Sequence, residues 1–192
     1  MLKKLSCLAL IAALSSMPAL ANNGSFYVGG QLGNTKLKIN EDGLSESESF
    51  NVLSGLVGYQ FNRNFALEAR LGTGVSDKTF SEDGYRESIS VAHQAAVLAK
   101  GIVPINDVFS LYGVAGFGSV KYNFKESGNG FSYSENETVD GLTAGVGAAF
   151  NMGSQWALTL EYLQLPDKKY SAGPYSFKVK TNSLSVGVNY SF

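Results

Sequence analysis

The chain has 192 residues, a formal net charge of −1, and a composition that is 44% hydrophobic and 16% charged. This length fits one domain, and the mildly acidic balance argues against nucleic-acid binding, which requires a basic patch. The chain has one cysteine and one histidine. That composition excludes a disulfide framework and a cysteine-based metal site.

The N-terminal segment has the three-part layout of a secretory signal peptide. Two lysines precede an apolar run from Leu5 to about Leu14, and the tripeptide ALA ends at Ala21. The run is shorter than the ~20 apolar residues of a transmembrane helix, and Cys7 lies too early in it for a lipoprotein. We predict a cleaved signal peptide over residues 1–21 and one β-barrel domain over residues 22–192. Removing the two lysines changes the formal charge from −1 to −3.

The rest of the chain repeats a pattern of strand, turn and strand, with apolar residues at every second position. Three short turns centre near Arg63, Asn106 and Gly153, and four longer polar stretches have the composition of loops. The predicted loops are Lys36–Ser49, Val75–Ser88, Tyr122–Glu137 and Pro166–Ser176. The eight predicted strands are Phe26–Thr35, Phe50–Phe61, Phe65–Val75, Ser88–Val103, Val108–Lys121, Thr138–Asn151, Trp156–Leu165 and Phe177–Phe192.

An even number of strands, with short connections at one end and long ones at the other, is the plan of an outer-membrane β-barrel. A soluble barrel of the lipocalin type is the alternative, with its apolar face inside. Within the strands, charged residues and glycines share one face, as in the segment LEARLG, and apolar residues share the other. A crowded interior needs small neighbours beside long charged side chains, so we predict that the polar face is inside and the apolar face meets lipid. The register of the fifth strand, SLYGVAGFGSV, stays open.

Aromatic residues gather near the strand ends on the short-turn side, which predicts an interfacial girdle. These are Phe26, Tyr59, Phe61, Phe65, Phe109, Phe150, Trp156, Tyr190 and Phe192. A second girdle on the long-loop side is expected from Tyr122, Phe124, Tyr162, Tyr170 and Phe177. The last strand must pair with the first, because a free edge in lipid would leave backbone groups unpaired.

The segments SFYVGGQLG, GYQFNRNFALEARLG and GVNYSF resemble the OmpA/OmpX-type small outer-membrane β-barrel family, and the resemblance covers the whole predicted mature chain. It implies an all-β fold, an eight-stranded antiparallel up-and-down transmembrane barrel. It also implies a terminal strand that the barrel-assembly machinery reads and a charged network in the lumen. The positions that match the terminal strand are Gly187, Val188, Tyr190 and Phe192. Those that match the charged network are Glu68, Arg70, Lys100 and Glu161. Anchoring to the cell wall, which full-length OmpA performs through a separate domain, is not implied.

Little in the sequence indicates catalysis. Glu68 and Glu161 share their predicted space with two cations, which favours salt bridges over acid–base chemistry. His93 is predicted to face outward, away from a nucleophile and an acid, and one histidine without cysteine argues against a zinc site. We expect no cofactor, and Phe131 and Tyr133 are candidate contacts in the third loop.

These observations predict a non-enzymatic protein of a Gram-negative outer membrane, with a structural or surface-interaction role through four extracellular loops. The expected partners are outer-membrane lipid or lipopolysaccharide, the barrel-assembly machinery during biogenesis, and a surface or host ligand at the loops. A small porin-like channel is the alternative, although an eight-stranded lumen is only wide enough for side chains to fill. An outer-membrane hydrolase is the third hypothesis.

Overall fold

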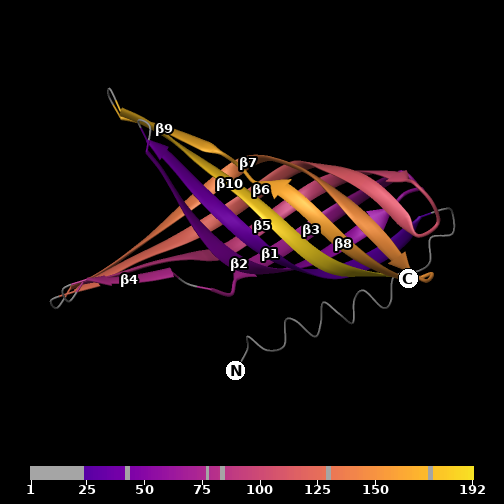
Figure 1. Cartoon of the computed structure of the whole chain (residues 1–192), viewed down its shortest axis with the longest axis horizontal. Coiled ribbons are helices and arrows are strands. Elements are labelled where there is room, and N and C mark those ends of the chain that lie inside the picture. Colours follow the sequence, from indigo (N-terminus) through magenta and orange to yellow (C-terminus); the bar gives the residue numbers. More distant parts are fainter. Residues whose placement is uncertain (1–23, 42–43, 77, 83–84, 129–130, 173–174) are drawn as a thin grey trace.

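The structure is a computed structural model that describes residues 24–41, 44–76, 78–82, 85–128, 131–172 and 175–192. The predicted signal peptide lies outside these residues. Within them the chain forms ten β-strands, and eight of the ten close into a ring of antiparallel ladders (Figure 1). The described residues contain no helix long and apolar enough to cross a membrane.

The ring follows the order of the strands along the chain and closes between the last and the first. Its members are β1 (Ser25–Glu41), β2 (Leu44–Gln60), β3 (Phe65–Gly74), β5 (Tyr85–Pro104), β6 (Phe109–Gly128), β7 (Phe131–Met152), β8 (Trp156–Gln164) and β10 (Tyr175–Ser191). In the described residues, β4 (Lys78–Glu82) pairs with β5 alone and β9 (Lys168–Ala172) pairs with β10 alone. The predicted eight-stranded antiparallel up-and-down barrel is confirmed.

The three short turns lie where the sequence places them, and local side chains explain two of them. Asn62 Oδ1 accepts a hydrogen bond from the backbone N–H of Phe65 at 3.0 Å, and Asn106 Oδ1 accepts one from Phe109 at 2.7 Å. Asparagine favours such turns because its side chain can hydrogen-bond the backbone a few residues on. In the third turn Gly153 has a φ of 88°, a left-handed conformation that glycine adopts without steric cost.

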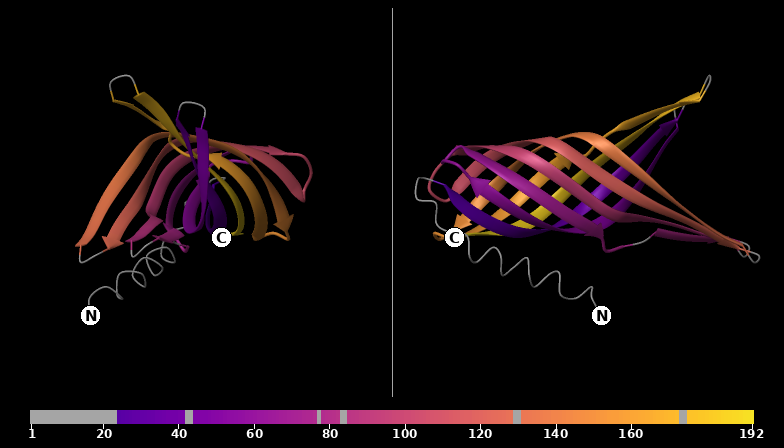
Figure 2. Two further views of the ribbon diagram at one scale, coloured as in Figure 1. Left: turned by 60° about the vertical axis from the view of Figure 1, so that its left-hand side comes forward. Right: turned by 180° about the vertical axis from the view of Figure 1, so that it is seen from behind.

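At the opposite end the strands run far into the stretches predicted as loops. The β6–β7 ladder continues to the pair Gly128 and Phe131, and the β1–β2 ladder to Glu41 and Leu44. Paired strands satisfy their backbone groups in each other, so a polar, solvated hairpin can extend a ladder well beyond the barrel. Figures 1 and 2 show two diverging projections, one from β4, β5, β6 and β7 and one from β1, β2, β9 and β10.

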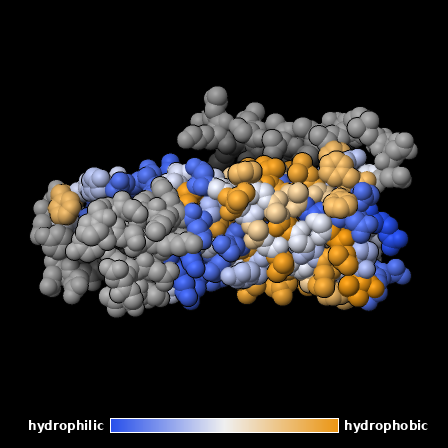
Figure 3. Space-filling view, turned by 90° about the horizontal axis from the view of Figure 1, so that it is seen from above, coloured by the Kyte–Doolittle hydropathy of each residue, from blue (hydrophilic) through white to orange (hydrophobic). Residues whose placement is uncertain are grey.

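The outer face of the barrel wall is apolar over a continuous belt. Leu71, Phe117 and Leu142 are 71%, 69% and 74% exposed, and the orange band in Figure 3 shows one side of this belt. The first polar outward residues beyond it, the polar boundary, are Asn34, Asn51, Thr73, His93, Ser119, Asp140, Gln164 and Asn182. Exposed apolar surface of this extent requires lipid or a partner around it.

Aromatic side chains pack together at the short-turn end, as the predicted girdle requires. Ring centroids lie 4.7 Å apart for Phe26 and Tyr59, and 4.9 Å apart for Trp156 and Tyr190. Tyr190 in turn contacts Phe192 at 5.2 Å.

The predicted second girdle is wrong for two of its five members. The inward residues of β6 are the even-numbered ones, which also fixes the open register of the fifth strand. Tyr122 is therefore buried in the lumen and Phe124 packs against the buried apolar cluster. Tyr162 does face outward. The side chains of Tyr170 and Phe177 lie outside the described part.

Candidate functional site

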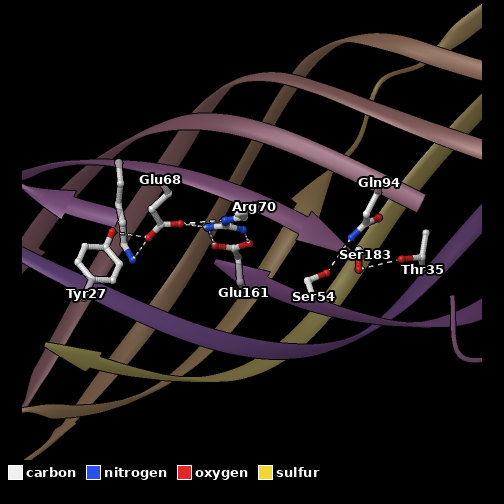
Figure 4. Close-up of polar contacts among 9 residues, drawn as sticks. Tyr27, Thr35, Ser54, Glu68, Arg70, Gln94, Glu161 and Ser183 are labelled. Carbon is white, nitrogen blue, oxygen red and sulfur yellow. Dashed lines mark hydrogen bonds and ion pairs between the residues drawn. The ribbon is translucent and has the colours of Figure 1, made fainter. Parts of the chain in front are cut away.

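Four charged side chains and a tyrosine meet inside the barrel (Figure 4). Arg70 on β3 forms a two-pronged ion pair with Glu161 on β8, and its Nη2 lies 2.9 Å from Glu161 Oε2. Arg70 Nε also donates to Glu68 Oε2 at 2.8 Å. The other oxygen of Glu68 accepts from Lys100 Nζ at 2.8 Å and from the Tyr27 hydroxyl at 2.7 Å. The structure thus brings together all four residues of the expected network.

The order of strands explains why this network crosses the lumen. In the ring, β3 and β8 are separated by three strands in either direction, so they form opposite walls. The Arg70–Glu161 pair therefore spans the barrel. Glu68 lies two residues before Arg70 and faces the same side, because side chains alternate along a strand.

Two tyrosines hold Lys100 from the side toward the short turns, and sequence reasoning missed both. Lys100 Nζ lies 4.0 Å from the ring centroid of Tyr112 and 5.7 Å from that of Tyr27, within cation–π range. The ring of Tyr112 lies over its cross-strand partner Gly147, and the ring of Tyr27 lies over its partner Gly58. A Cβ atom at either glycine would collide with the ring. A glycine directly opposite an inward aromatic residue is the signal that could have revealed them.

The network is buried and balanced in charge. Each of its four charged residues is at most 7% exposed, and two carboxylates face two cations. Both carboxylates are held by cations, so neither is poised as a free acid or base. Among the described residues, no group of three or more His, Cys, Asp or Glu could hold a metal ion.

Beyond the network, toward the long hairpins, the inner face is largely apolar, although the buried hydroxyl groups of Thr35, Thr181 and Ser183 lie among these apolar neighbours. This apolar section consists of Leu37, Phe50, Val52, Val91, Val120, Tyr122, Val139, Leu163 and Leu165. The predicted polar inner face is therefore found around the charge network, whereas most inward residues of this half of the lumen are apolar. Apolar side chains fill a narrow space without needing hydrogen-bond partners, which explains why they suit an interior away from the paired charges.

Two cavities lie on opposite sides of the network. A vestibule of about 280 Å³ opens at the short-turn end and is lined by Tyr27, Lys100 and Tyr112. On the other side, Arg70 and Glu161 line a cavity of about 30 Å³, room for about one water molecule. The charge network thus lies between the two cavities.

His93 lies on the outer face at the polar boundary, opposite Lys121 on β6. A register shift between Val91 and His93 turns Val91 into the lumen, whereas an unbroken alternation from Lys100 would put it outside. Among the described residues, His93 makes no hydrogen bond to a nucleophile or an acid. The geometry of a hydrolase site is not assembled around it.

The last strand places the expected assembly-signal residues at the ring closure. Val188, Tyr190 and Phe192 point outward, and Gly187 points inward against Gln31. The Phe192 backbone N–H donates to the Phe26 carbonyl at 3.0 Å. The predicted loop residues Phe131 and Tyr133 lie instead on a strand, at the outer end of β7, and are 48% and 56% exposed.

A closed antiparallel ring with an apolar outside and a charged, filled inside defines a small transmembrane β-barrel protein. The chain matches the outer membrane protein beta-barrel domain family over residues 6–192, and it belongs to this family. It is thus a small β-barrel protein of the bacterial outer membrane, and its short-turn end is the periplasmic end.

Solved structures with the same fold include those of three bacterial proteins. Ail, the attachment invasion locus protein of Yersinia pestis, was solved in complex with the heparin analogue sucrose octasulfate; it is 20% identical with a TM-score of 0.59, over 89% of this chain and 100% of Ail. OprG of Pseudomonas aeruginosa is 16% identical with a TM-score of 0.58, over 88% and 96% of the two chains. Neisserial surface protein A is 16% identical with a TM-score of 0.56, over 89% and 100%. No curated protein sequence matches this chain.

The central ion pair predicts a large effect on stability. Arg70→Met should lower the free energy of unfolding by about 3–5 kcal/mol, because it leaves the buried Glu161 carboxylate without a cation. Arg63→Met, in an exposed turn, is the matched control and should change it by less than about 0.5 kcal/mol. Guanidinium unfolding of the barrel in lipid vesicles, followed by the fluorescence of Trp156, measures both. The double variant Arg70→Met/Glu161→Met should recover most of the loss, and equal costs for Arg70→Met and Arg63→Met would contradict the ion-pair account.

Proposed function

We propose that this protein is a non-enzymatic surface-interaction protein, in which a filled barrel anchors two β-sheet projections outside the cell. The observation that carries the proposal is the contrast between the two ends of the molecule. The lumen is crossed by the Arg70–Glu161 ion pair and filled by the apolar section, whereas the ladders continue far beyond the polar boundary.

The filled lumen argues against transport as the main role. A solute would have to break the charge network and then pass the apolar section, which lie in series along the barrel. Opening the charge network would unpair buried charges. Opening the apolar section would displace side chains such as Phe50, which is fully buried.

The projection from β4, β5, β6 and β7 supports a binding role. Over residues 131–143, β7 pairs with β6 but has no described ladder partner on its other side. Phe131 and Tyr133 lie at its outer end with about half of their surface exposed. Aromatic side chains in such positions are common anchors of protein interfaces.

The ligand class that we propose is a host or neighbouring-cell surface molecule. Ail shares the fold and was solved with a heparin analogue, which makes a sulfated polysaccharide the first ligand to test. Recognition of Gly187, Val188, Tyr190 and Phe192 by the barrel-assembly machinery is likewise part of the proposal. It is supported by their place at the ring closure.

Surface display tests the binding role. A non-adherent laboratory Gram-negative strain that expresses the protein should adhere to epithelial monolayers or to immobilised heparin several-fold better than the empty strain. Phe131→Ser/Tyr133→Ser should remove most of this gain, because it deletes the exposed aromatic anchors. Ser132→Ala/Ser134→Ala, on the same strand, is the matched control and should keep the gain. No gain on either surface, at a surface amount equal to that of a known adhesin, would sink the proposal.

Planar-bilayer recording separates this function from the channel alternative. The unaltered protein should show no stable large conductance, because two barriers stand in series. Arg70→Ala/Phe50→Ala, which weakens both, should conduct more than either single variant. Arg63→Ala, at the periplasmic mouth, should leave the current unchanged. A steady large current through the unaltered protein would establish the channel instead.

A further inference from the structure

Three lysines form a cluster on the outer face of the barrel, just beyond the polar boundary. Lys36 and Lys38 lie on β1 and Lys180 lies on β10, at the seam where the ring closes. Their strand neighbours Leu37 and Thr181 are buried in the lumen. Because side chains alternate along a strand, the three lysines point outward.

The register brings the three side chains together. Lys38 and Lys180 are direct cross-strand partners, and Lys36 is opposite Asn182, so it is the diagonal neighbour of Lys180. Direct partners have Cβ atoms about 4.5–5.5 Å apart, and diagonal neighbours are about 7–8 Å apart. Flexible ammonium groups at these spacings can meet on a single tetrahedral anion.

The cluster has no compensating charge in the described structure. None of the three lysines makes an ion pair with a described residue, and like charges directly opposite each other destabilise a sheet. An anion held between them would remove this repulsion. The arrangement is therefore suited to an anionic ligand that comes from outside the chain.

The height of the cluster on the wall identifies the kind of anion. Lys36 and Lys180 each lie two residues beyond the polar boundary, about 7 Å further along the strand than Asn34 and Asn182. On the other side of that boundary the outward residues are Leu32 and Leu184, which are more than half exposed to lipid. The cluster thus lies at the level of the head groups, directly above acyl chains.

The opposite wall lacks such a cluster among its described residues. The strand across the ring from β1 is β6, where Lys121 faces outward at the matching height. The register partners of Lys121 are His93 and Thr138, so no second lysine lies directly opposite it. Lys121 can therefore serve as a control position for the three-lysine cluster.

We propose that Lys36, Lys38 and Lys180 bind a phosphate group of lipid A, the acylated glycolipid of the outer leaflet. The site lies on the barrel wall at the β1–β10 seam, and it does not rest on the surface-interaction role proposed for the hairpins. The shared height of lysines and head groups, with lipid-facing leucines beneath them, selects a membrane lipid over a soluble anion. Basic side chains near an anionic membrane surface each add to affinity.

Native mass spectrometry of the full-length protein in neutral detergent tests the site with bisphosphorylated hexa-acyl lipid A as the probe. Lys36→Gln/Lys38→Gln/Lys180→Gln should weaken binding at least about tenfold, because three attractive charges are lost. The charge-preserving arginine triple variant should bind within about threefold of the unaltered protein. Lys121→Gln/Lys125→Gln, on the opposite wall, is the control and should bind like the unaltered protein.

Dephosphorylated lipid A allows a second comparison that uses only the unaltered protein. It should bind the unaltered protein about as weakly as the glutamine triple variant binds the phosphorylated probe. Equal binding of both lipids by the unaltered protein would overturn the proposal, and so would unchanged affinity in the glutamine triple variant. Inorganic phosphate bound as tightly as lipid A would overturn the choice of a membrane lipid.

Discussion

Closure of the hydrogen-bonded ring is the constraint on which the rest of the structure depends. In hydrocarbon, each unpaired backbone N–H or C=O costs several kcal/mol, so a sheet in the membrane must have no edge. The β1–β10 ladder meets this requirement from Tyr27 opposite Ser191 to Glu41 opposite Phe177. Where the ladders leave the apolar belt the requirement ends, and there the ring opens into two separate projections.

Closing only eight strands leaves a lumen that side chains must fill. The chain fills it in two ways, with paired charges near the periplasmic end and with the apolar section near the hairpins. The paired charges are neutral as a unit. Glycines opposite Tyr27 and Tyr112 make room for the two rings that contact Lys100. The same closure brings Lys180 beside Lys38, so the filling of the lumen and the proposed head-group site both depend on it.

Period-two alternation predicted the strands and the barrel. The charges and glycines that share one face of those strands predicted that Glu68, Arg70, Lys100 and Glu161 face inward, because each of these is a local property. Alternation could not show that Arg70 meets Glu161, 91 residues away, since that contact depends on ring order. Nor could it show the apolar section, because alternation is the same whichever face is inside. The hairpins were predicted as loops because their composition is polar, yet pairing with a neighbour rather than composition keeps them extended. The register shift before His93 leaves no sign in the alternation.

The most direct test of ring closure is a disulfide across its seam. Leu32 and Val186 are register partners on β1 and β10, and antiparallel partners have Cα separations of about 4.5–5.5 Å, within the range of a disulfide. In a Cys7→Ser background, Leu32→Cys/Val186→Cys should oxidise within one chain and shift its mobility on a non-reducing gel. Leu32→Cys/Leu142→Cys, with the second cysteine on β7, should not shift. A seam pair that stays reduced while the distant pair forms a bond would contradict the closed barrel.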